Sequence, residues 1–477
     1  MRSGDDQPVT DQPVTDLLAG WLPHRRWFAG KGREIDEISI ATATELRPAD
    51  PALHHLVLTV RQGETLDRYQ LLLGMRHDLP ERLRPGEIGR LPGADGMWLY
   101  DAAYDPQATR VLLGHMAHGA VVGPLRFCHA PGMGIETGLD GVVGTAEQSN
   151  TSVVFGDSYI GKLFRRLSPG INPDLEVNLA LTNLGCAHVP AVHGWIELEQ
   201  SGGPGLADDE GATLALLSEF LRTGTDGWQL AITSVRDWFA QALPPGTEPD
   251  PGLAGGDFAA EAERLGAATA AVHRDLAAAF GTTPQPIAGI RAAAEGMRGQ
   301  LAEACQDVPE LVPYAKAIGA AFDEFAGLSG SPPFQRIHGD FHLGQAMRTE
   351  TGWVLLDFEG EPARSPGERR AVSHPLRDVA GLLRSFEYAA RFLLADAEST
   401  SPEGARELEM RAHAWAARNR SAFCRGYAAA GGVDPEEHAV IVRAFELDKA
   451  VYEVRYEARN RPSWLHVPLR SLAHLGD

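Results

Sequence analysis

The run IHGDFHLGQ at residues 337–345, followed by WVLLDFEG at residues 353–360, decides how this sequence folds. In each run an apolar segment ends in an aspartate, Asp340 in the first and Asp357 in the second. The amide side chain of Gln345 lies five residues after Asp340 and twelve residues before Asp357. Short apolar runs that end in polar residues are typical of buried strands. The two runs therefore predict two carboxylates and one amide presented at the ends of buried segments.

This set of side chains is what phosphoryl transfer needs. One carboxylate orients the attacking hydroxyl and accepts its proton, while hard oxygen ligands hold Mg²⁺ on the nucleotide phosphates. The plainer alternative is that Asp340 and Asp357 merely end strands in turns, where aspartate is common. Either residue alone favours that alternative, but the neighbouring histidines and the spacing of the whole set favour phosphoryl transfer.

Composition narrows the class of protein. The chain has 477 residues, with 43 Lys and Arg against 64 Asp and Glu, and a net charge of −21. This excess of acid argues against a nucleic-acid binder, which needs clustered basic residues. The four cysteines lie far apart without a CxxC, so neither a disulfide framework nor structural zinc is expected, and a reducing compartment fits. No signal-like segment or apolar run of about 18 residues is present, so we expect a cytoplasmic protein without membrane association.

Strand signals dominate the first half of the chain and helical patterns the second. Residues 55–60 and 69–74 alternate in polarity around the turn residues 62–64 and predict a hairpin. Further strands are predicted at residues 111–113, 153–155, 159–164, 195–198 and 214–220. Helices are predicted at residues 258–273, 376–395, 407–430 and 437–459. Strands first and helices later indicate an α+β protein with two lobes.

The first residues and the glycine-rich segment near them carry weaker signals. DQPVT occurs twice, at residues 6–10 and 11–15, and this polar repeat predicts a disordered tail over residues 1–16. The glycines and lysine of residues 25–33 lack the GxxxxGK[ST] order, so they do not predict a phosphate loop. A passage rich in proline and glycine at residues 80–96 is interpreted as a domain boundary.

Phosphoryl transfer also needs a lysine for the nucleotide phosphates and a helical glutamate to hold it. Lys162 lies among apolar residues on a predicted strand, and a helix with an Asn172 cap follows. Glu176 in that helix is the predicted partner of Lys162. The alternative is that Lys162 is a solvated strand residue and Glu176 a charge that favours the helix dipole.

Two further segments are predicted to contact the nucleotide. Gln148, Ser149, Asn150 and Thr151 precede the Lys162 hairpin, and their small polar side chains could bind phosphates, although a GxGxxG is missing. The connection between the lobes is expected at residues 217–221, so Ser218, Glu219 and Leu221 are predicted to lie at the adenine. Ser218 and Glu219 fit a strand end equally well.

The motifs resemble those of the protein-kinase-like phosphotransferases. Protein kinases carry HRDxxxxN and DFG, and the aminoglycoside and choline phosphotransferases carry HGDxHxxN followed by an aspartate-bearing strand. Here HGD begins at His338, Gln345 takes the place of the asparagine, and DFE begins at Asp357. The resemblance implies a bilobal protein-kinase-like α+β fold, Asp340 as the catalytic base, and Gln345 and Asp357 as Mg²⁺ ligands, with ATP as the phosphoryl donor. Glu359 in place of glycine adds a carboxylate that could reach the metal through water.

Longer strings are similar to those of the actinobacterial maltokinase family. They are RWFAGKGR at residues 26–33, EQSNT at 147–151, FRRLSPGINPD at 164–174, DFEGEP at 357–362 and FELDKAVYE at 445–453. The resemblance implies ATP-dependent phosphorylation of maltose to maltose 1-phosphate, on the way from trehalose to α-glucan, with trehalose synthase as a partner. It also implies three parts after the tail, which we place at residues 17–90 for an N-terminal cap subdomain, 91–221 for an intermediate β-rich subdomain and 222–477 for a helical C-lobe.

A predicted helix at residues 445–460 offers groups suited to a neutral sugar. Tyr452 and Tyr456 recur at helical spacing, and aromatic rings can cover the apolar face of a pyranose. Asp448 and Lys449 add hydrogen-bonding groups, and His342 could reach the substrate or only brace its loop. The alternative for this helix is ordinary packing with exposed charges.

Two other functions remain open from the sequence. A kinase of another small acceptor, such as glucosamine or an aminoglycoside, would use the same catalytic centre. A catalytically silent nucleotide-binding subunit that regulates trehalose synthase is the alternative from another class. Retention of Lys162, Asp340, Gln345 and Asp357 argues against the silent subunit.

Overall fold

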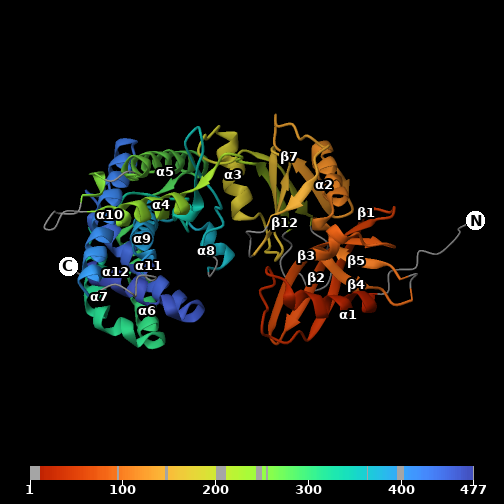
Figure 1. The fold of residues 1–477 in the computed structure, drawn as a ribbon, viewed down its shortest axis with the longest axis horizontal. Coiled ribbons are helices and arrows are strands. Elements are labelled where there is room, and N and C mark those ends of the chain that lie inside the picture. The colour runs from red at the N-terminus through yellow and green to blue at the C-terminus, as the bar shows by residue number, and fades with distance from the viewer. Residues whose placement is uncertain are drawn as a thin grey trace, which may run out of the picture. The chain divides into compact units, whose positions relative to one another are not determined.

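The computed structural model divides the chain into two units (Figure 1). Unit 1 comprises Met1–Leu179 and Ala191–Arg222, and unit 2 comprises Ala180–Pro190 and Thr223–Asp477. The structure describes residues 11–93, 96–144, 149–199, 211–242, 250–253, 256–361, 364–394 and 402–475. Unit 1 is rich in strands and unit 2 in helices, so the expected α+β class is confirmed.

A five-stranded sheet with the order β1-β2-β3-β5-β4 forms the first part of unit 1. Its strands are β1 (Glu37–Arg47), β2 (Ala52–Gln62), β3 (Thr65–Arg76), β4 (Glu87–Arg90) and β5 (Trp98–Asp101). The predicted hairpin is confirmed, because β2 pairs antiparallel with β3 from Gln62 opposite Thr65. Gly63 in the turn has a φ of 61°, a left-handed value that glycine adopts without steric cost.

Two predicted boundaries in this region are wrong. Residues 11–16 belong to helix α1 (Asp11–Trp21) rather than to a disordered tail, because Val14, Leu18 and Trp21 share one buried face. Residues 1–10 lie outside the described part of the chain. The cap sheet also continues past residue 90, since β5 pairs with β3 as its direct neighbour. The passage at residues 80–96 therefore lies within the cap and is not its end.

A seven-stranded sheet with the order β6-β7-β11-β12-β10-β9-β8 completes unit 1. Its strands are β6 (Val121–Val122), β7 (Leu125–His129), β8 (Gly141–Val143), β9 (Thr151–Phe155), β10 (Tyr159–Leu163), β11 (Val192–Leu198) and β12 (Ala212–Glu219). The strands predicted at residues 153–155, 159–164, 195–198 and 214–220 are confirmed, with ends that differ by at most three residues. Helix α2 (Pro106–His118) packs against the sheet, and α3 (Pro173–Asn183) starts in unit 1 and has its last residues in unit 2.

The strand predicted at residues 111–113 is instead the middle of α2. Asp105 caps this helix by accepting a hydrogen bond from the Gln107 backbone at 2.9 Å, and Pro106 occupies the first helical position. Leu112, Leu113 and Met116 are buried on its inner face. A short apolar run cannot distinguish a strand from the buried face of a helix, and the cap decides here.

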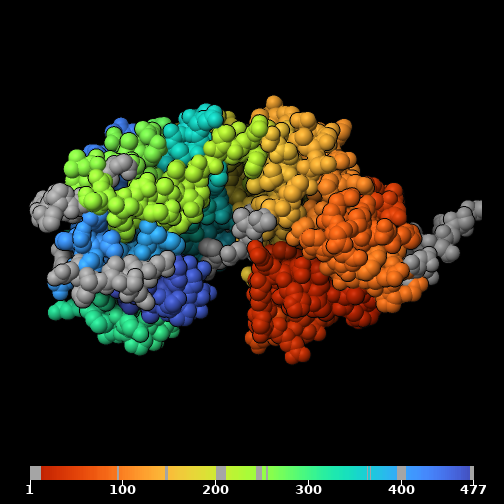
Figure 2. Space-filling view, viewed as in Figure 1, coloured from red at the N-terminus to blue at the C-terminus, as the bar shows by residue number. Residues whose placement is uncertain are grey.

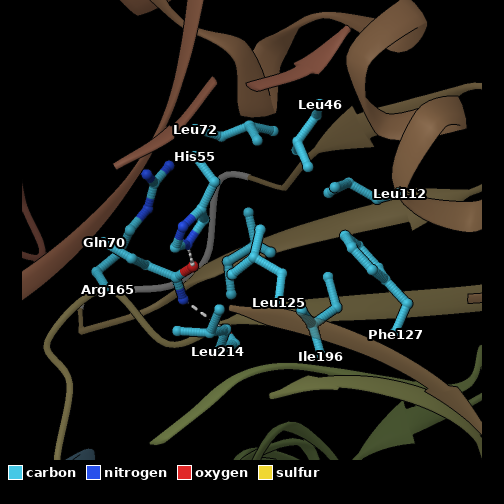
Figure 3. A pocket seen from close by; sticks show the side chains of 11 residues that line it. Leu46, His55, Gln70, Leu72, Leu112, Leu125, Phe127, Arg165, Ile196 and Leu214 are labelled. Atoms are coloured by element: carbon cyan, nitrogen blue, oxygen red, sulfur yellow. Dashed lines mark hydrogen bonds between the residues drawn. The ribbon is translucent and has the colours of Figure 1, made fainter. Parts of the chain in front are cut away.

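Polar side chains join the two sheets of unit 1 around a cavity of about 20 Å³. Gln70 on β3 donates through Nε2 to the carbonyl oxygens of Phe164, at 2.9 Å, and of Leu214. Its side-chain oxygen lies 3.0 Å from His55 Nε2. Figure 3 shows His55 and Gln70 facing each other among leucine, isoleucine and phenylalanine side chains. Strand β3 of the cap is thus hydrogen-bonded to the segment that follows β10.

Unit 2 is a bundle of helices with two small sheets (Figure 1). The helices are α4 (Gly227–Ala240), α5 (Ala259–Phe280), α6 (Ile287–Asp307), α7 (Ala315–Ala326), α8 (Pro366–Arg370), α9 (Leu376–Phe392), α10 (Pro402–Ala429), α11 (Ala439–Asn460) and α12 (His466–Leu475). One sheet has the order β13 (Thr225–Asp226), β16 (Ala346–Arg348), β17 (Trp353–Leu355), and the other pairs β14 (Thr282–Thr283) with β15 (Phe334–Gln335). The four predicted helices correspond to α5, α9, α10 and α11.

Packing within unit 2 centres on α9, which contacts both α10 and α11. Figure 2 shows that segments distant in sequence share the surface of this unit, with C-terminal helices in blue beside α6 and α7 in green. In the described part of the chain the 3₁₀ helices are η1 (Leu22–His24), η2 (Glu81–Gly86), η3 (Ala102–Tyr104), η4 (Pro251–Leu253), η5 (Pro309–Tyr314), η6 (Leu343–Gln345) and η7 (Pro462–Trp464). None of the helices in the described ranges combines the length and hydropathy that crossing a membrane requires.

Candidate active site

The loop that carries Asp340 is held by a buried carboxylate on α9. Asp378, in the first turn of that helix, accepts hydrogen bonds from the backbone N–H groups of His338 at 2.7 Å and Gly339 at 2.9 Å. Its Oδ2 also lies 3.0 Å from His273 Nε2. Burial alone would raise the pKa of Asp378, but its hydrogen bonds and the nearby histidines outweigh burial and lower that pKa. Asp378 therefore stays ionised and fixes the backbone immediately before Asp340.

His338 connects the same loop to the segment that leads to Asp357. Its Nε2 lies 2.8 Å from the Leu356 carbonyl oxygen, while its Nδ1 accepts the Asp340 N–H at 3.4 Å. Because a carbonyl oxygen can only accept, Nε2 carries the proton and Nδ1 is the acceptor. The His338 ring also packs on Phe358, with ring centroids 4.7 Å apart. His338 is thus a structural hydrogen-bonding residue.

His342, a predicted substrate contact, braces the loop. Its Nδ1 accepts the Gly344 N–H at 3.1 Å and caps η6, whose last residue is Gln345. Burial lowers the pKa of His342, which keeps the ring neutral and able to accept this bond. The substrate-contact role of His342 stays a prediction.

The predicted metal ligands Gln345 and Asp357 lie together at the base of the β16–β17 hairpin. Gln345 Nε2 is 3.2 Å from Asp357 Oδ2, and the Leu356 N–H donates to the Gln345 carbonyl oxygen at 2.9 Å. Asp357 has a φ of 63°, a left-handed conformation that costs free energy in a non-glycine residue and is typical of functional sites. Glu359 follows two residues later and is half-buried. Carboxylate and amide oxygens suit Mg²⁺, so the donor set fits this ion.

Lys449 on α11 bridges Asp340 to a second carboxylate. Its Nζ lies 2.9 Å from Asp340 Oδ1 and 2.9 Å from Glu361 Oε1. Burial would lower the pKa of Lys449, but the two carboxylates outweigh burial and raise it. Burial would raise the pKa of Glu361, yet the charges of Lys449, Arg377 and Arg364 lower it to about 2. The pair is therefore fully ionised at neutral pH.

The other predicted sugar contacts on α11 surround this lysine. Lys449 Nζ lies 4.9 Å from the centre of the Tyr452 ring, and Tyr452 stacks on the exposed Tyr456 with centroids 6.2 Å apart. Burial raises the pKa of Asp448, whose Oδ2 lies 3.8 Å from an Arg377 nitrogen. The structure thus brings the predicted catalytic base and Lys449 into direct contact, with Tyr452 beside the lysine, while sugar binding itself stays a prediction.

In unit 1, Lys162 forms an ion pair with Asp174, which was not among the predicted site residues. Lys162 lies on β10, and its Nζ is 3.1 Å from Asp174 Oδ2. Asp174 is held in turn by Asn178 Nδ2 at 2.8 Å and by the Asn172 cap, which accepts the Asp174 N–H at 2.8 Å. Glu176 follows on the same helix, and its role as partner of Lys162 stays a prediction.

The remaining predicted nucleotide contacts lie at strand ends of unit 1. Ser149 and Asn150 precede β9, Ser218 and Glu219 end β12, and Leu221 follows that strand; Gln148 lies outside the described residues. The buried Thr151 hydroxyl accepts a hydrogen bond from Arg165 Nε at 2.8 Å. In this contact the hydroxyl oxygen is the acceptor, and the phosphate-contact role of Thr151 stays a prediction, as it does for the other residues of this group.

The Asp340 loop and Asp357 stand at the positions of the HRD and DFG motifs of the protein-kinase-like phosphotransferases, with Gln345 in place of the motif asparagine. The chain belongs to the phosphotransferase enzyme family, whose model matches residues 143–424. Residues 21–105 match the maltokinase N-terminal cap domain, which agrees with a cap sheet that includes β5. The predicted protein-kinase-like fold and family are therefore confirmed, and the chain is a kinase of the phosphotransferase family.

Individual relatives are glucosamine kinases. The chain is 29% identical over 358 residues to the glucosamine kinase of Streptacidiphilus jiangxiensis, covering 71% of this chain and 74% of that enzyme. It is 26% identical over 344 residues to the glucosamine kinase of Mycolicibacterium smegmatis, covering 70% and 79%. A solved glucosamine kinase in complex with glucosamine, ADP and inorganic phosphate matches with a TM-score of 0.65 and 22% identity, covering 97% of this chain and 98% of that chain. At this identity the structural match shows the shared fold.

Sequence reasoning missed three residues that organise these sites: Asp174, Glu361 and Asp378. Asp174 and Asp378 both lie in the first turn of a helix, where an acidic residue is ordinary and carries no motif. Glu361 stands directly after the DFEG run, and its four-residue distance from Asp357 was the available signal.

Proposed function

We propose that the protein phosphorylates maltose at its anomeric hydroxyl, with ATP as donor, and releases maltose 1-phosphate and ADP. The observation that carries this proposal is the match of residues 21–105 to the maltokinase N-terminal cap domain on a chain of the phosphotransferase family. The tyrosines of α11 near Lys449 support a sugar as acceptor, because aromatic rings pack on pyranose faces.

In the proposed reaction, Asp340 accepts the proton of the anomeric hydroxyl as its oxygen attacks the γ-phosphorus. A bond forms between that oxygen and phosphorus, and the bond from phosphorus to the bridging oxygen of ADP breaks. Gln345 and Asp357 would hold Mg²⁺, which neutralises phosphate charge, and Lys162 would bind the phosphates. Positioning and charge neutralisation lower the barrier, while Asp378 keeps the Asp340 loop in place.

The proposed biological setting follows from the acceptor. Maltose 1-phosphate production places the enzyme between trehalose and α-glucan or glycogen in the cytoplasm. Trehalose synthase, which makes maltose, is the proposed partner.

A glucosamine kinase is the second candidate, and the names of the relatives favour it. That acceptor differs from maltose in size and in charge, since its amino group is protonated near neutral pH. The charge difference gives a sharp experimental distinction between the two candidates.

An ATP-consumption screen with maltose, glucosamine, glucose and aminoglycosides tests the proposal. We expect turnover that depends on maltose, with NMR locating the phosphate on the anomeric carbon. Maltose-independent turnover would remove the assignment, and preferential turnover of glucosamine would favour the second candidate. Nucleotide binding without turnover of any acceptor would favour a silent regulatory subunit.

A further inference from the structure

Lys449 lies between two carboxylates that could otherwise bind the ammonium group of a cationic acceptor. Its ammonium lies 2.9 Å from both Asp340 Oδ1 and Glu361 Oε1, so two carboxylates converge on one protein-borne positive charge. The side chains of Lys449 and Glu361 are only 19% and 4% exposed. Bulk water therefore screens this charge less than it would at an open surface.

A small cavity adjoins this ion pair within unit 2, and its lining includes Asp340, Glu361, Arg377, Asp448 and Lys449. Asp448 is only 7% exposed, and its Oδ1 has no hydrogen-bond partner among the described residues. A buried acceptor atom without a partner costs free energy unless a ligand or water donates to it. The lining of the cavity therefore includes both the predicted catalytic base and a carboxylate that can still accept a hydrogen bond.

Among the described residues, the carboxylates around the cavity outnumber the cations by one even when Lys449 is counted: they are Asp340, Glu361, Asp378 and Asp448, against Arg364, Arg377 and Lys449. Arg364 and Arg377 lie against Glu361, at 2.6 and 3.6 Å, and Arg377 reaches Asp448 at 3.8 Å. Both arginines thus form ion pairs with carboxylates other than Asp340. Removing the Lys449 ammonium would make the cluster one unit more negative and leave Asp340 without its cation.

We propose that Lys449 is a specificity-determining residue that admits neutral sugars to Asp340 and excludes amino sugars. The inference rests on the proposed function, because it concerns the acceptor of the same site. An acceptor hydroxyl can approach Asp340 beside the lysine, whereas a sugar ammonium at that position meets a like charge. Without Lys449, the carboxylates of Asp340 and Glu361 become a binding site for the ammonium group of an amino sugar.

The test compares Lys449→Met, which removes the charge but keeps the length, with Lys449→Arg, which keeps the charge. For each variant kcat/KM is measured with maltose and with glucosamine, and the ratio of the two values is compared. Lys316→Met on α7 is the control, because Lys316 is exposed. We expect Lys449→Met to shift the ratio toward glucosamine by at least about tenfold, and Lys449→Arg and Lys316→Met to leave it within about twofold.

An unchanged ratio in a Lys449→Met enzyme that still uses maltose would overturn the inference and leave the proposed function intact. Wild-type turnover of glucosamine in preference to maltose would instead overturn the proposed function. A second measurement avoids variants altogether: glucose and glucosamine are compared as inhibitors of maltose phosphorylation by the wild-type enzyme. We expect glucosamine to bind at least about tenfold more weakly than glucose, and equal or tighter binding of glucosamine would also overturn the inference.

Discussion

Asp340 has one carboxylate oxygen, Oδ1, in an ion pair with Lys449, while its backbone is fixed through the Asp378 hydrogen bonds to the two preceding residues. An amide at this position would keep the shape but could not accept the proton of the sugar hydroxyl. We expect Asp340→Asn to lower kcat by about 10²- to 10⁴-fold, the usual effect of losing a general base. Steady-state kinetics with maltose measures this loss.

Nucleotide affinity separates loss of the base from loss of the fold. We expect Asp340→Asn to bind ATP within about twofold of the wild-type Kd by calorimetry, because positioning the hydroxyl is its main task. Asp323→Asn on α7 is the matched control, since that carboxylate is exposed, and its kcat should equal that of the wild type. A kcat above one tenth of the wild-type value in Asp340→Asn would contradict the assignment.

His55 gives unit 1 a defined sensitivity to acid. Burial lowers its pKa to about 4, whereas an unfolded histidine titrates near 6.5. The unfolded state therefore binds an extra proton between these values, and stability is lost as the pH falls from 6.5 toward 4. Between pH 7.5 and pH 5 this group alone should remove about 2 kcal/mol of unfolding free energy.

We expect His55→Asn to lose less stability over that pH range than the wild type. The difference should correspond to about 4–8 °C in the change of the melting temperature, measured calorimetrically at pH 7.5 and pH 5. His118→Asn serves as control because His118 is exposed on the same unit, and its acid-induced change should match the wild type. Identical changes for His55→Asn and the wild type would contradict a buried neutral His55.

At the scale of elements, α9 supports the catalytic loop through Asp378 and through Ser385, whose hydroxyl accepts the Leu343 N–H at 3.1 Å. Asp378→Asn would replace one of the two carboxylate oxygens, which now accept from the His338 and Gly339 N–H groups and contact His273, with an amide NH₂. At least one buried donor would then lose its acceptor, at a cost of about 1–3 kcal/mol. We expect kcat to fall by at least about tenfold through misplacement of Asp340, with KM for ATP nearly unchanged.

His273→Gln provides the graded comparison for this prediction. It removes one contact of Asp378 but leaves both backbone hydrogen bonds in place, so its kcat should fall less than that of Asp378→Asn. Melting temperature and kcat are measured for both variants. Equal kcat values in Asp378→Asn and the wild type would show that Asp378 does not position the loop.

The elements that could be predicted from sequence are those whose local pattern agrees with their tertiary environment. The β2–β3 hairpin and helices α5, α9, α10 and α11 have long periodic patterns, so their type was evident. The segment 111–113 was misassigned because three apolar residues carry no period, and the Asp105 cap was the decisive signal. Asp378 could not be predicted, since its role comes from a distant loop that packs over the start of α9.

At the scale of the whole molecule, motifs whose residues are close in sequence could be predicted, whereas contacts between residues far apart in sequence could not. The pair Gln345 and Asp357 was predictable because twelve residues and a tight hairpin bring the two side chains together. Lys449 lies 109 residues after Asp340, and although the helix at residues 445–460 suggested it as a sugar contact, no sequence pattern indicated its ion pair with Asp340. The attachment of the cap through Gln70 to Phe164, directly after β10, and to Leu214 in β12 left no sequence signal, because its hydrogen bonds go to backbone carbonyls.

The hydrogen bonds of Gln70 lead us to expect that the cap influences nucleotide binding through the position of Lys162. Gln70→Leu would remove the donors to the Phe164 and Leu214 carbonyls and leave His55 Nε2 without its partner, at a cost of about 2–4 kcal/mol from buried unpaired groups. Phe164 lies two residues after Lys162, so the phosphate-binding lysine should shift with it. We expect a lower melting temperature and a KM for ATP raised by about three- to tenfold, with KM for the sugar within about twofold. Gln229→Leu, on an exposed position of α4, should change none of these values, and an unchanged KM for ATP in Gln70→Leu would limit the cap to a stabilising role.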